Sequence, residues 1–282
     1  MSLLPSPRIT IITSSHRDLA GLQRTHESLL SQRLPQVQWV VVDSGSGDGT
    51  AAWLQAQASD WIRWVSEPDQ GIYDAWNKGL RLAQGEWIVF VGAGDLVLNL
   101  QAMLQAASDP VSASHPERLR YGPVRISNAQ GQALYTLGEP WEQIKPQMPQ
   151  VMRLPHPALL HHRSLFDECG GFDASFRIAG DYELLLRCLQ RTQARFHPTA
   201  PWVAMHLGGV STQPAQAMRQ LQEVRRAQLQ NGIAQAGPLW KAAVMRVRVR
   251  LWLSRLLPEP WVHHLLDWGR KLQGKPAHWT RS

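Results

Sequence analysis

Apolar runs and helical segments alternate along the first ninety residues of the chain. Four runs rich in β-branched residues predict strands, at 8–14, 37–43, 61–66 and 86–91. Three intervening segments predict helices, at 18–32, 50–58 and 71–85. The strand runs are apolar on both faces, as is typical of strands covered by helices on both sides. This pattern predicts an α/β fold with a mostly parallel central sheet flanked by helices.

The alternation weakens after residue 100. Segments 119–126 and 132–137 predict a pair of strands joined by a turn from Asn128 to Gly131. Five prolines between 138 and 157 predict an irregular loop. Farther along, the sequence predicts a helix at 180–190, a strand at 195–206 and a long helix at about 214–231.

Polar side chains gather where the predicted strands end. They are Thr13, Ser14 and Ser15, then Asp43 and Ser44, and finally the segment from Gly92 to Asp95. In parallel sheets, ligands bind outside the carboxyl ends of the strands. Asp95 stands alone between glycines and apolar residues, where a carboxylate is costly to bury without a partner. The sequence therefore predicts a polar ligand crevice at this edge, with Asp95 facing it.

The composition fits one large globular domain, alone or with an appendage. Of the 282 residues, 44% are hydrophobic and 18% are charged. Cys169 and Cys188 are too few for a disulfide framework and are most simply small buried residues. They suggest a reducing compartment, or a protein that does not use disulfide bridges. No basic segment followed by an apolar stretch opens the chain, so no signal peptide is expected. No apolar run approaches the roughly 18–20 residues that span a bilayer.

Charge is distributed unevenly along the chain, whose formal net charge is +7. Residues 216–282 contain twelve lysines and arginines but only three aspartates and glutamates, a net charge of +9, which leaves −2 for residues 1–215. A near-neutral body with a cationic tail indicates an anionic partner for the tail, either a membrane surface or nucleic acid.

Three sequence blocks occur in a fixed order: VVVDSGSGDGT (40–50), SEPDQGIYDAWNKGLRLAQGEWIVFVGAGD (66–95) and GGFDASFRIAGDYELLLR (170–187). Together they resemble the family 2 glycosyltransferases with the GT-A fold. The middle block is similar to the colanic-acid-like branch, which builds bacterial surface polysaccharides. The resemblance covers about residues 8–212. It implies a GT-A (Rossmann-like) fold and an inverting transfer of sugar from a nucleotide-sugar donor, by default a UDP-sugar, to a saccharide or lipid-linked acceptor.

The resemblance also implies roles for individual residues. Asp181 matches the catalytic base, and Asp95 matches the last acid of the D-x-D metal-binding motif. The GGVS stretch at 208–211 matches a loop that follows the last strand in this branch. The positions implied to bind the nucleotide, its ribose and its diphosphate are Thr13, Ser14, Ser15, Asp43, Ser44, Asp69, Asn77 and Lys78.

The residue types suit this chemistry. Departure of a nucleoside diphosphate develops negative charge that a divalent cation can neutralise, and an acceptor hydroxyl needs a base to take its proton. Ala93 replaces the first acid of D-x-D, so Asp95 and the substrate's phosphates would hold the cation, with His206 as a further candidate ligand. The expected cofactor is Mg²⁺ or Mn²⁺, because Mg²⁺ often relies on one or two carboxylates plus phosphate.

Each assignment has a structural alternative. Asp43 is also a common turn residue, and Asp181 is an acid in the first turn of a helix, where the helix dipole favours it. Asp48 suits the N-cap of the following helix better than a ligand role. His206 can be a strand-end histidine with satisfied hydrogen bonds. His156 is a candidate neighbour of the acceptor site.

The predicted organisation is a GT-A catalytic domain at 1–212 and a helical, basic, tryptophan-rich extension at 213–282. The main hypothesis is an inverting, hexosyltransferase-type enzyme of cell-surface polysaccharide biosynthesis. The alternative is a catalytically silent nucleotide-sugar-binding or scaffold module of a polysaccharide assembly complex, but the presence of both Asp95 and Asp181 favours the enzyme. A nucleotidyltransferase is a third hypothesis. Such an enzyme is expected to have a glycine-rich loop with lysine or arginine after the first strand, and the segment TSSHRDLAGL has no such loop.

The extension interleaves basic residues with Trp240, Trp252, Trp261 and Trp268. Tryptophan prefers the headgroup region of a bilayer, and basic residues are attracted to anionic lipids. This predicts contact with an anionic membrane surface, and a cytoplasmic protein at the inner face of the membrane. Packing of the tryptophans on the catalytic domain is the alternative. Nucleic acid is not an expected partner, because no recognition motif accompanies the charge. The arginines at 246, 248 and 250 alternate as in a strand, whereas their flanks predict helix.

Overall fold

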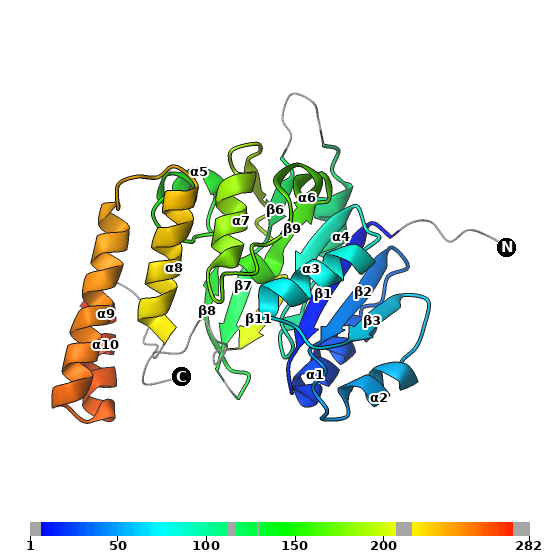
Figure 1. The fold of residues 1–282 in the computed structure, drawn as a ribbon, viewed down its shortest axis with the longest axis horizontal. Coiled ribbons are helices and arrows are strands. Elements are labelled where there is room, and N and C mark those ends of the chain that lie inside the picture. Colours follow the sequence, from blue (N-terminus) through cyan, green and yellow to red (C-terminus); the bar gives the residue numbers. More distant parts are fainter. Residues whose placement is uncertain (1–6, 112–116, 129, 207–215, 273–282) are drawn as a thin grey trace.

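The structure is a computed structural model that describes residues 7–111, 117–128, 130–206 and 216–272. Figure 1 shows a central sheet with helices packed against it, and the last helices at the end of the molecule opposite to β3. The GGVS stretch at 208–211, which was matched to a loop after the last strand, lies outside the described residues.

The first ninety residues fold as their alternation predicts. The elements are β1 (Ile9–Ser15), α1 (Leu19–Leu30), β2 (Val37–Asp43), α2 (Thr50–Ala56), β3 (Ile62–Ser66), α3 (Ile72–Leu82) and β4 (Trp87–Phe90). The Asp18 side chain caps α1 by accepting a hydrogen bond from the Gly21 N–H. The prediction that Asp48 is the N-cap of the next helix was wrong, because Gly49 occupies that position and no side chain caps α2. Asp48 instead accepts a hydrogen bond from the Thr50 N–H two residues on, as in an Asx-turn.

The second half of the catalytic region contains shorter elements. They are β5 (Leu96–Val97), α4 (Leu100–Ser108), β6 (Leu119–Tyr121), β7 (Val124–Ser127), β8 (Ala133–Leu137), α5 (Trp141–Ile144), β9 (Leu159–His162), α6 (Ser164–Cys169), α7 (Gly180–Cys188), β10 (Ala194–Phe196) and β11 (Val203–His206), with 3-10 turns η1 (Lys145–Gln147) and η2 (His156–Ala158). The predicted pairing of 132–137 with the preceding strand is confirmed by the antiparallel pair β7–β8. The predicted helix at 180–190 is α7.

The strands form two sheets. Seven strands in the order β10-β6-β9-β4-β1-β2-β3 make the central sheet, and β5-β11-β7-β8 make a smaller one. β1 runs parallel to β2 and β4, and β2 runs parallel to β3. β9 runs antiparallel to both of its neighbours, β4 and β6. The central sheet is therefore mixed, and its first four strands have the parallel arrangement that the sequence predicts.

Two segments that were each predicted as one strand divide between the two sheets, so these predictions were wrong. Segment 119–126 forms β6 and β7, and segment 195–206 forms β10 and β11. The indole of Trp202 packs so closely on Gly122 that a Cβ there would lie 2.3 Å from the ring. Pro123 follows and has no N–H to donate to a ladder. The chain leaves the central sheet at this glycine–proline pair and continues in the smaller sheet.

Helices cover both faces of the central sheet, and each face has its own core. Ile12 and Val42 belong to a cluster with residues of α3, α6 and α7, whereas Ile11 and Val41 belong to a cluster with residues of α1, α2 and α4. Successive side chains of a strand point to opposite faces, so both sets are buried. Burial of each such side chain contributes roughly 1.5–3 kcal/mol. This two-sided core fixes the register of β1, β2 and β3, and with it the polar edge.

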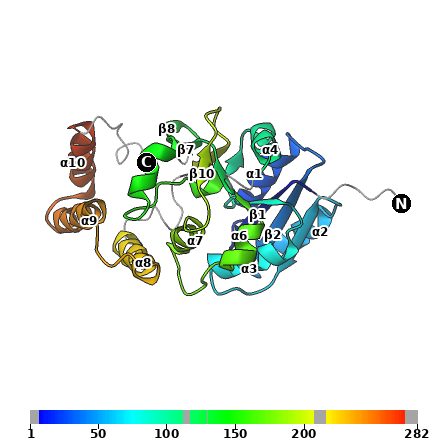
Figure 2. The same cartoon turned by 90° about the horizontal axis from the view of Figure 1, so that it is seen from above.

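Three helices follow the second sheet: α8 (Ala217–Gln230), α9 (Pro238–Leu256) and α10 (Glu259–Leu272). α8 lies beside α7 in Figure 1 and contributes Val224 and Ala227 to the core. α9 has no buried residue and lies beside α10 at the end of the molecule, as Figure 2 shows from above. The alternating arginines at 246, 248 and 250 lie within α9, so this segment is helical like its flanks and not a strand. Within the part of the chain that the structure describes, no helix is long and apolar enough to cross a bilayer.

Candidate active site

Three strands end side by side at one edge of the central sheet. Ser15 at the end of β1 pairs with Asp43 at the end of β2, and Asp43 pairs in turn with Ser66 at the end of β3. The strands are parallel here, so these are carboxyl ends, where α/β proteins bind ligands. The Ser15 hydroxyl is buried and has no hydrogen-bond partner among the described residues. The predicted polar edge is present, and it retains unused hydrogen-bonding capacity.

Asp43 orders the loop that follows β2. Its Oδ2 accepts hydrogen bonds from the Ser46 backbone N–H at 3.1 Å and from the Ser66 hydroxyl at 2.6 Å, and its Oδ1 accepts one from the Ser46 hydroxyl. The residue is only 1% exposed. Asp43 therefore stabilises the turn after β2, which was the structural alternative for this residue. A hydrogen bond to a nucleotide base would be a second role.

The other hydroxyl groups near this edge face different surroundings. Thr13 is fully buried and accepts a hydrogen bond from the Trp39 indole N–H at 3.0 Å, so its side chain faces the core. The Ser44 hydroxyl lies 2.7 Å from Nδ1 of His16. Ser14 is partly exposed. His16 could not be predicted from the sequence, because a single histidine after a strand has no distinguishing spacing.

Asp69 and Lys78 hold the loop before α3. Asp69 accepts a hydrogen bond from the Gly71 N–H at 2.8 Å. The Lys78 ammonium lies 2.9 Å from a Glu67 carboxylate oxygen and donates to the Pro68 carbonyl at 2.6 Å. Both residues stabilise a loop that leads into α3, and Lys78 already has a carboxylate partner in the structure.

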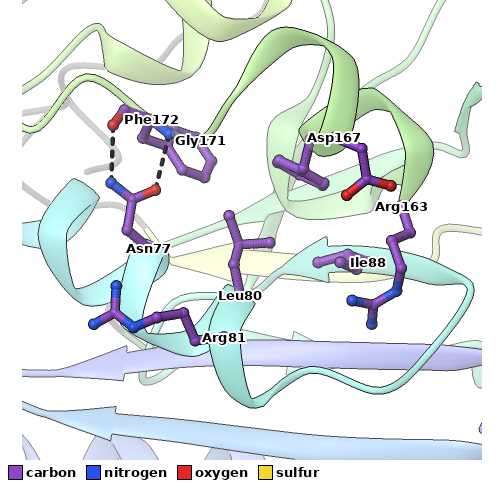
Figure 3. A pocket seen from close by; sticks show the side chains of 9 residues that line it. Asn77, Leu80, Arg81, Ile88, Arg163, Asp167, Gly171 and Phe172 are labelled. Atoms are coloured by element: carbon purple, nitrogen blue, oxygen red, sulfur yellow. Dashed lines mark hydrogen bonds between the residues drawn. The ribbon is translucent and has the colours of Figure 1, made fainter.

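Asn77 fixes a distant segment to α3. Its side-chain amide donates to the Phe172 carbonyl at 2.8 Å and accepts from the Phe172 N–H at 2.9 Å, as drawn in Figure 3. Both residues border a pocket of about 420 Å³ between α3 and α6. Arg163, which also lines this pocket, donates to the Gly85 carbonyl before β4. The pocket therefore lies toward the amino end of β4, away from the polar edge.

The turn that carries Asp95 is attached to α1. The Thr25 hydroxyl accepts a hydrogen bond from the Gly94 N–H at 3.0 Å and donates one to the Asp95 carbonyl at 2.8 Å. Gly94 has a φ of +91°, a conformation that favours glycine. The GAGD sequence thus forms a tight turn whose position is set by a helix on the opposite side of the sheet from α3.

Asp95 and His206 are the predicted metal ligands, and the structure brings them together. Oδ1 of Asp95 accepts a hydrogen bond from the His206 N–H at 3.3 Å, and Nδ1 of His206 is buried without a partner among the described residues. Burial raises the pKa of Asp95 to about 7, so a nearby cation would stabilise its charged form. Among the residues that the structure describes, no group of three or more His, Cys, Asp or Glu side chains could hold a metal ion. The pair fits a divalent cation if phosphate oxygens and water complete the coordination.

Asp181, the predicted base, lies in the first turn of α7. Its Oδ1 accepts hydrogen bonds from the Tyr182 N–H at 2.8 Å and from the Tyr73 hydroxyl at 3.3 Å. Gly180 allows this approach, because a Cβ there would lie 2.8 Å from the Tyr73 ring. Burial raises the pKa of the Asp181 carboxyl to about 6. A carboxylate with this pKa can take a proton from a hydroxyl group near neutral pH.

Sequence reasoning missed two residues around Asp181. Tyr73 lies in the quoted block GIYDAW, but only the fold places it beside Asp181, 108 residues farther along the chain. Glu223 on α8 accepts hydrogen bonds from the N–H groups of Ile178 and Ala179, immediately before α7. In the sequence it is one of three acids in a basic tail, and no motif distinguishes it.

Comparison with known families identifies the class of protein. Residues 10–168 match the sequence profile of Glycosyl transferase family 2. The chain belongs to this family. An uncharacterized glycosyltransferase of Mycobacterium tuberculosis is 32% identical over 188 residues, which cover 64% of this chain and 69% of the relative. The PGL/p-HBAD biosynthesis glycosyltransferase of Mycobacterium bovis is 26% identical over 190 residues, which cover 66% of this chain and 71% of the relative. The predicted family is confirmed, and the colanic-acid-like branch stays a prediction.

Solved structures confirm the GT-A fold of this glycosyltransferase. S. aureus TarS 1–349 in complex with UDP-GlcNAc has a TM-score of 0.58 at 14% identity, over 78% of this chain and 66% of that one. The mannosyltransferase PcManGT from Pyrobaculum calidifontis, in complex with GDP-Man and Mn²⁺, has a TM-score of 0.59 at 18% identity, over 95% of this chain and 80% of that one. At these identities the likeness establishes the fold alone.

Proposed function

We propose that this family 2 glycosyltransferase is an inverting enzyme that transfers a hexosyl group from a nucleotide sugar to a saccharide or lipid-linked acceptor in cell-surface polysaccharide biosynthesis. The observation that carries the proposal is the placement of two carboxyl groups. Asp95 lies in the turn after β4 and accepts a hydrogen bond from the His206 N–H, and Asp181 lies in the first turn of α7 and accepts one from the Tyr73 hydroxyl. Burial raises the pKa of both groups. Carboxyl groups perturbed by burial are typical of catalytic sites. They favour an enzyme over a silent binding or scaffold module.

The donor would bind at the carboxyl edge of the central sheet. Ser15 contributes a hydroxyl without a partner among the described residues, Ser44 lies beside His16, and Asp43 orders the loop between them. Asp69 and Lys78 would act on the donor side by holding the loop before α3. The UDP-GlcNAc and GDP-Man complexes of the two structural neighbours support a nucleotide sugar as donor. A UDP-sugar is the first donor to test.

We place a Mg²⁺ or Mn²⁺ ion on Asp95 and His206, together with the donor's diphosphate. One carboxylate and one imidazole leave coordination positions for phosphate oxygens and water, an arrangement that suits Mg²⁺. A cation bound there supplies positive charge against the negative charge that develops on the departing diphosphate. The Mn²⁺ in the PcManGT complex supports a divalent cation in this fold.

Asp181 would act as the base. Above about pH 6 its carboxyl group is ionised and can accept the proton of the acceptor hydroxyl. The hydroxyl oxygen then forms a bond to the anomeric carbon, and the bond from that carbon to the nucleoside diphosphate breaks on the opposite side, which inverts the configuration. The Tyr73 hydroxyl, 3.3 Å from Oδ1 of Asp181, keeps the carboxylate oriented.

A donor screen followed by a transfer assay tests this proposal. Purified protein is melted with a panel of nucleotide sugars, each with and without Mg²⁺ or Mn²⁺, because a ligand that binds the native state raises the melting temperature. The donor that gives the largest shift is then assayed for transfer, and the anomeric configuration of the product is determined by NMR. A protein that binds no nucleotide sugar under any of these conditions would refute the proposal. Binding without transfer to any saccharide or lipid-linked acceptor would support the silent module instead.

We also propose that α9 and α10 contact an anionic membrane surface. On α9, the side chains of Met245, Val249, Trp252 and Leu256 are 44–61% exposed and follow one another at helical spacing, so they form an apolar stripe. Leu251, which is 42% exposed, lies outside this stripe. Basic residues recur every seven positions beside this stripe, at Lys241, Arg248 and Arg255. An apolar stripe flanked by cationic side chains is typical of helices that lie in the membrane interface.

α10 carries a second apolar stripe of the same kind. Trp261, Leu265 and Trp268 are 66%, 44% and 64% exposed at spacings of four and three residues. Trp240 behaves differently: its indole N–H donates to the Leu221 carbonyl at 3.0 Å, and its ring packs against the core. The alternative that the tryptophans pack on the catalytic domain therefore applies to Trp240 and not to the exposed rings of α10.

The proposed division into a catalytic domain at 1–212 and an extension at 213–282 fits this arrangement if α8 serves as the connection. Because Val224 and Ala227 of α8 are part of the core, α9 and α10 are the elements left to meet a surface. Contact through them would hold a cytoplasmic enzyme at the inner face of the membrane, next to a lipid-linked acceptor.

Co-sedimentation with vesicles tests the membrane proposal. The full-length protein is compared with a version that ends at Gly237, which removes α9 and α10 but keeps α8. We expect binding to vesicles with anionic lipid, weakening as salt is raised because the basic residues are screened, and loss of binding on truncation. If the full-length protein stays in the supernatant at low salt, or if the truncated protein binds equally well, the membrane proposal is wrong.

A further inference from the structure

A carboxylate from α8 binds the backbone immediately before the helix of the proposed base. Oε2 of Glu223 accepts hydrogen bonds from three consecutive N–H groups, those of Arg177 at 3.0 Å, Ile178 at 2.8 Å and Ala179 at 3.0 Å. Glu223 is 8% exposed. Ala179 is the N-cap residue of α7, and Arg177 and Ile178 precede it, so the carboxylate binds the chain just before the helix N-terminus, where a negative charge is favourable.

A second residue of α8 contacts the same loop. Arg226, one turn after Glu223, donates to the Ser175 hydroxyl at 2.6 Å, and its guanidinium carbon lies 3.6 Å from the centre of the Phe176 ring. It also lies 3.8 Å from the Asp173 carboxylate. Two side chains on one face of α8 therefore hold both ends of loop 173–179, the segment that leads into Asp181.

We infer that Glu223 is a positioning residue for sugar transfer, which holds loop 177–179 and thereby sets the place of Asp181 on α7. This inference rests on the proposed role of Asp181 as the base. Rigid placement matters because a displacement of about 1 Å at a reacting group can cost on the order of 10²-fold in rate. The loop also reaches the donor side of the site, since a guanidinium nitrogen of Arg177 lies 2.7 Å from where a Cβ of Gly71 would be.

The charge of Glu223 has a second effect on Asp181. Burial is the main cause of the raised pKa of Asp181, hydrogen bonds from Tyr182 and Tyr73 oppose it, and the negative charge of Glu223 adds to it. Arg219 balances part of that charge, with its Nε 3.4 Å from Oε1 of Glu223. Removal of the charge without removal of the hydrogen-bond acceptor should therefore lower the pKa of Asp181.

Two substitutions separate these effects, with Glu142→Gln on the exposed face of α5 as a matched control for the loss of one carboxylate. Glu223→Gln keeps an oxygen that can accept from the loop, whereas Glu223→Ala leaves the three N–H groups without this partner. The measurements are amide hydrogen exchange over residues 177–182, kcat and KM for the donor, and the pH dependence of kcat.

In Glu223→Ala we expect faster exchange in this segment and a loss of about 10²-fold in kcat, with the donor's KM little changed. In Glu223→Gln we expect exchange close to that of the unmodified protein and an acid limb of the pH profile that moves to lower pH. The Glu142→Gln control should change none of these. Retention of full kcat, or unchanged hydrogen exchange over residues 177–182, in Glu223→Ala would overturn the inference. If Glu223→Ala fails to fold, Glu223→Asp, which withdraws the carboxylate by one methylene, should show the same two changes to a smaller degree, and normal exchange and kcat in that variant would overturn the inference.

Failure of the proposed function would look different. If the unmodified protein transfers no sugar, hydrogen exchange over 177–182 and an NMR titration of the Asp181 carboxyl group remain measurable in all variants. Unchanged exchange in Glu223→Ala would then overturn the positioning role, and faster exchange there would support it without any transfer assay. The Asp181 titration in Glu223→Gln measures the separate effect of the Glu223 charge.

Discussion

Replacement of Asp95 by Asn should stabilise the ligand-free protein at pH 8 and remove its stabilisation by Mn²⁺ with a nucleoside diphosphate. Burial raises the pKa of Asp95 to about 7 from an ordinary value of 3.8. Between these two values the folded state holds a proton that the unfolded state has lost, so the stability falls as the pH rises toward 7. Above about pH 7 the folded protein carries the cost of a partly buried charge, which the neutral amide does not have.

The size of the effect follows from the two pKa values. Their difference of about 3 corresponds to about 4 kcal/mol, at 1.36 kcal/mol for each tenfold change in proton affinity. Asp95 is partly exposed, and solvent screening reduces this to about 1–2 kcal/mol. In a chain of this length, 1 kcal/mol shifts the melting temperature by about 2–4 °C. The Asp95→Asn variant should therefore melt roughly 2–8 °C higher at pH 8 and together with the unmodified protein at pH 4.

Thermal melts at pH 4, 6 and 8, with and without Mn²⁺ and UDP, measure both halves of this prediction. The unmodified protein should gain about 2.7 kcal/mol when the ligand is present at 100 times its Kd, and the Asp95→Asn variant should gain little. Asp60→Asn, at an exposed position, is the control for the loss of one charge. A variant that melts lower than the unmodified protein at pH 8 would show that the charge of Asp95 does not destabilise the folded protein. A variant that gains as much stability from Mn²⁺ and UDP as the unmodified protein would show that Asp95 is not a metal ligand.

Two further substitutions test other parts of the site. Asp181→Asn should bind the donor normally in calorimetry but transfer sugar roughly 10²–10⁴-fold more slowly, and kcat of the unmodified enzyme should rise with pH through about 6 as the carboxyl ionises. A variant with most of the normal rate would exclude Asp181 as the base. Gly180→Ala places a Cβ 2.8 Å from the Tyr73 ring and should lower the free energy of unfolding by roughly 1–3 kcal/mol in urea denaturation. Gly269→Ala, where a Cβ has open space, is its control, and equal stability of the two variants would contradict the predicted clash.

The first half of the fold is predictable because its hydrophobic pattern is unambiguous. Strands β1 and β2 are buried on both faces and separated by helices, so each apolar run corresponds to one strand. After residue 110 the strands are only three to five residues long, and segments 119–126 and 195–206 each pass from one sheet to the other. The break between β6 and β7 falls at Gly122–Pro123, a local signal that the sequence prediction overlooked. The packing of Trp202 on Gly122 joins residues far apart in the chain, so the sheet that each half enters could not be read from a local pattern.

The candidate site, like the fold, was predictable from the sequence only in part. The polar strand ends could be predicted from the sequence, because the end of a buried run also marks the edge of a parallel sheet. Side-chain direction could not: Thr13 and Ser14 are neighbours, yet Thr13 faces the core and binds Trp39. The partners of Asp181 were also out of reach. Tyr73 and Glu223 come from helices that only the tertiary fold brings to α7.

The raised pKa of Asp95 has a consequence for the proposed cation. Burial raises the pKa of Asp95 to about 7, so near neutral pH part of the protein holds a proton on this carboxyl group. A cation that binds Asp95 must displace that proton, so proton and cation compete for the same oxygens. Cation-dependent donor binding should therefore weaken below pH 7, and it should release a proton that calorimetry in buffers of different ionisation enthalpy detects. Binding that is equally tight at pH 5.5 and pH 8 would mean that Asp95 does not hold the cation.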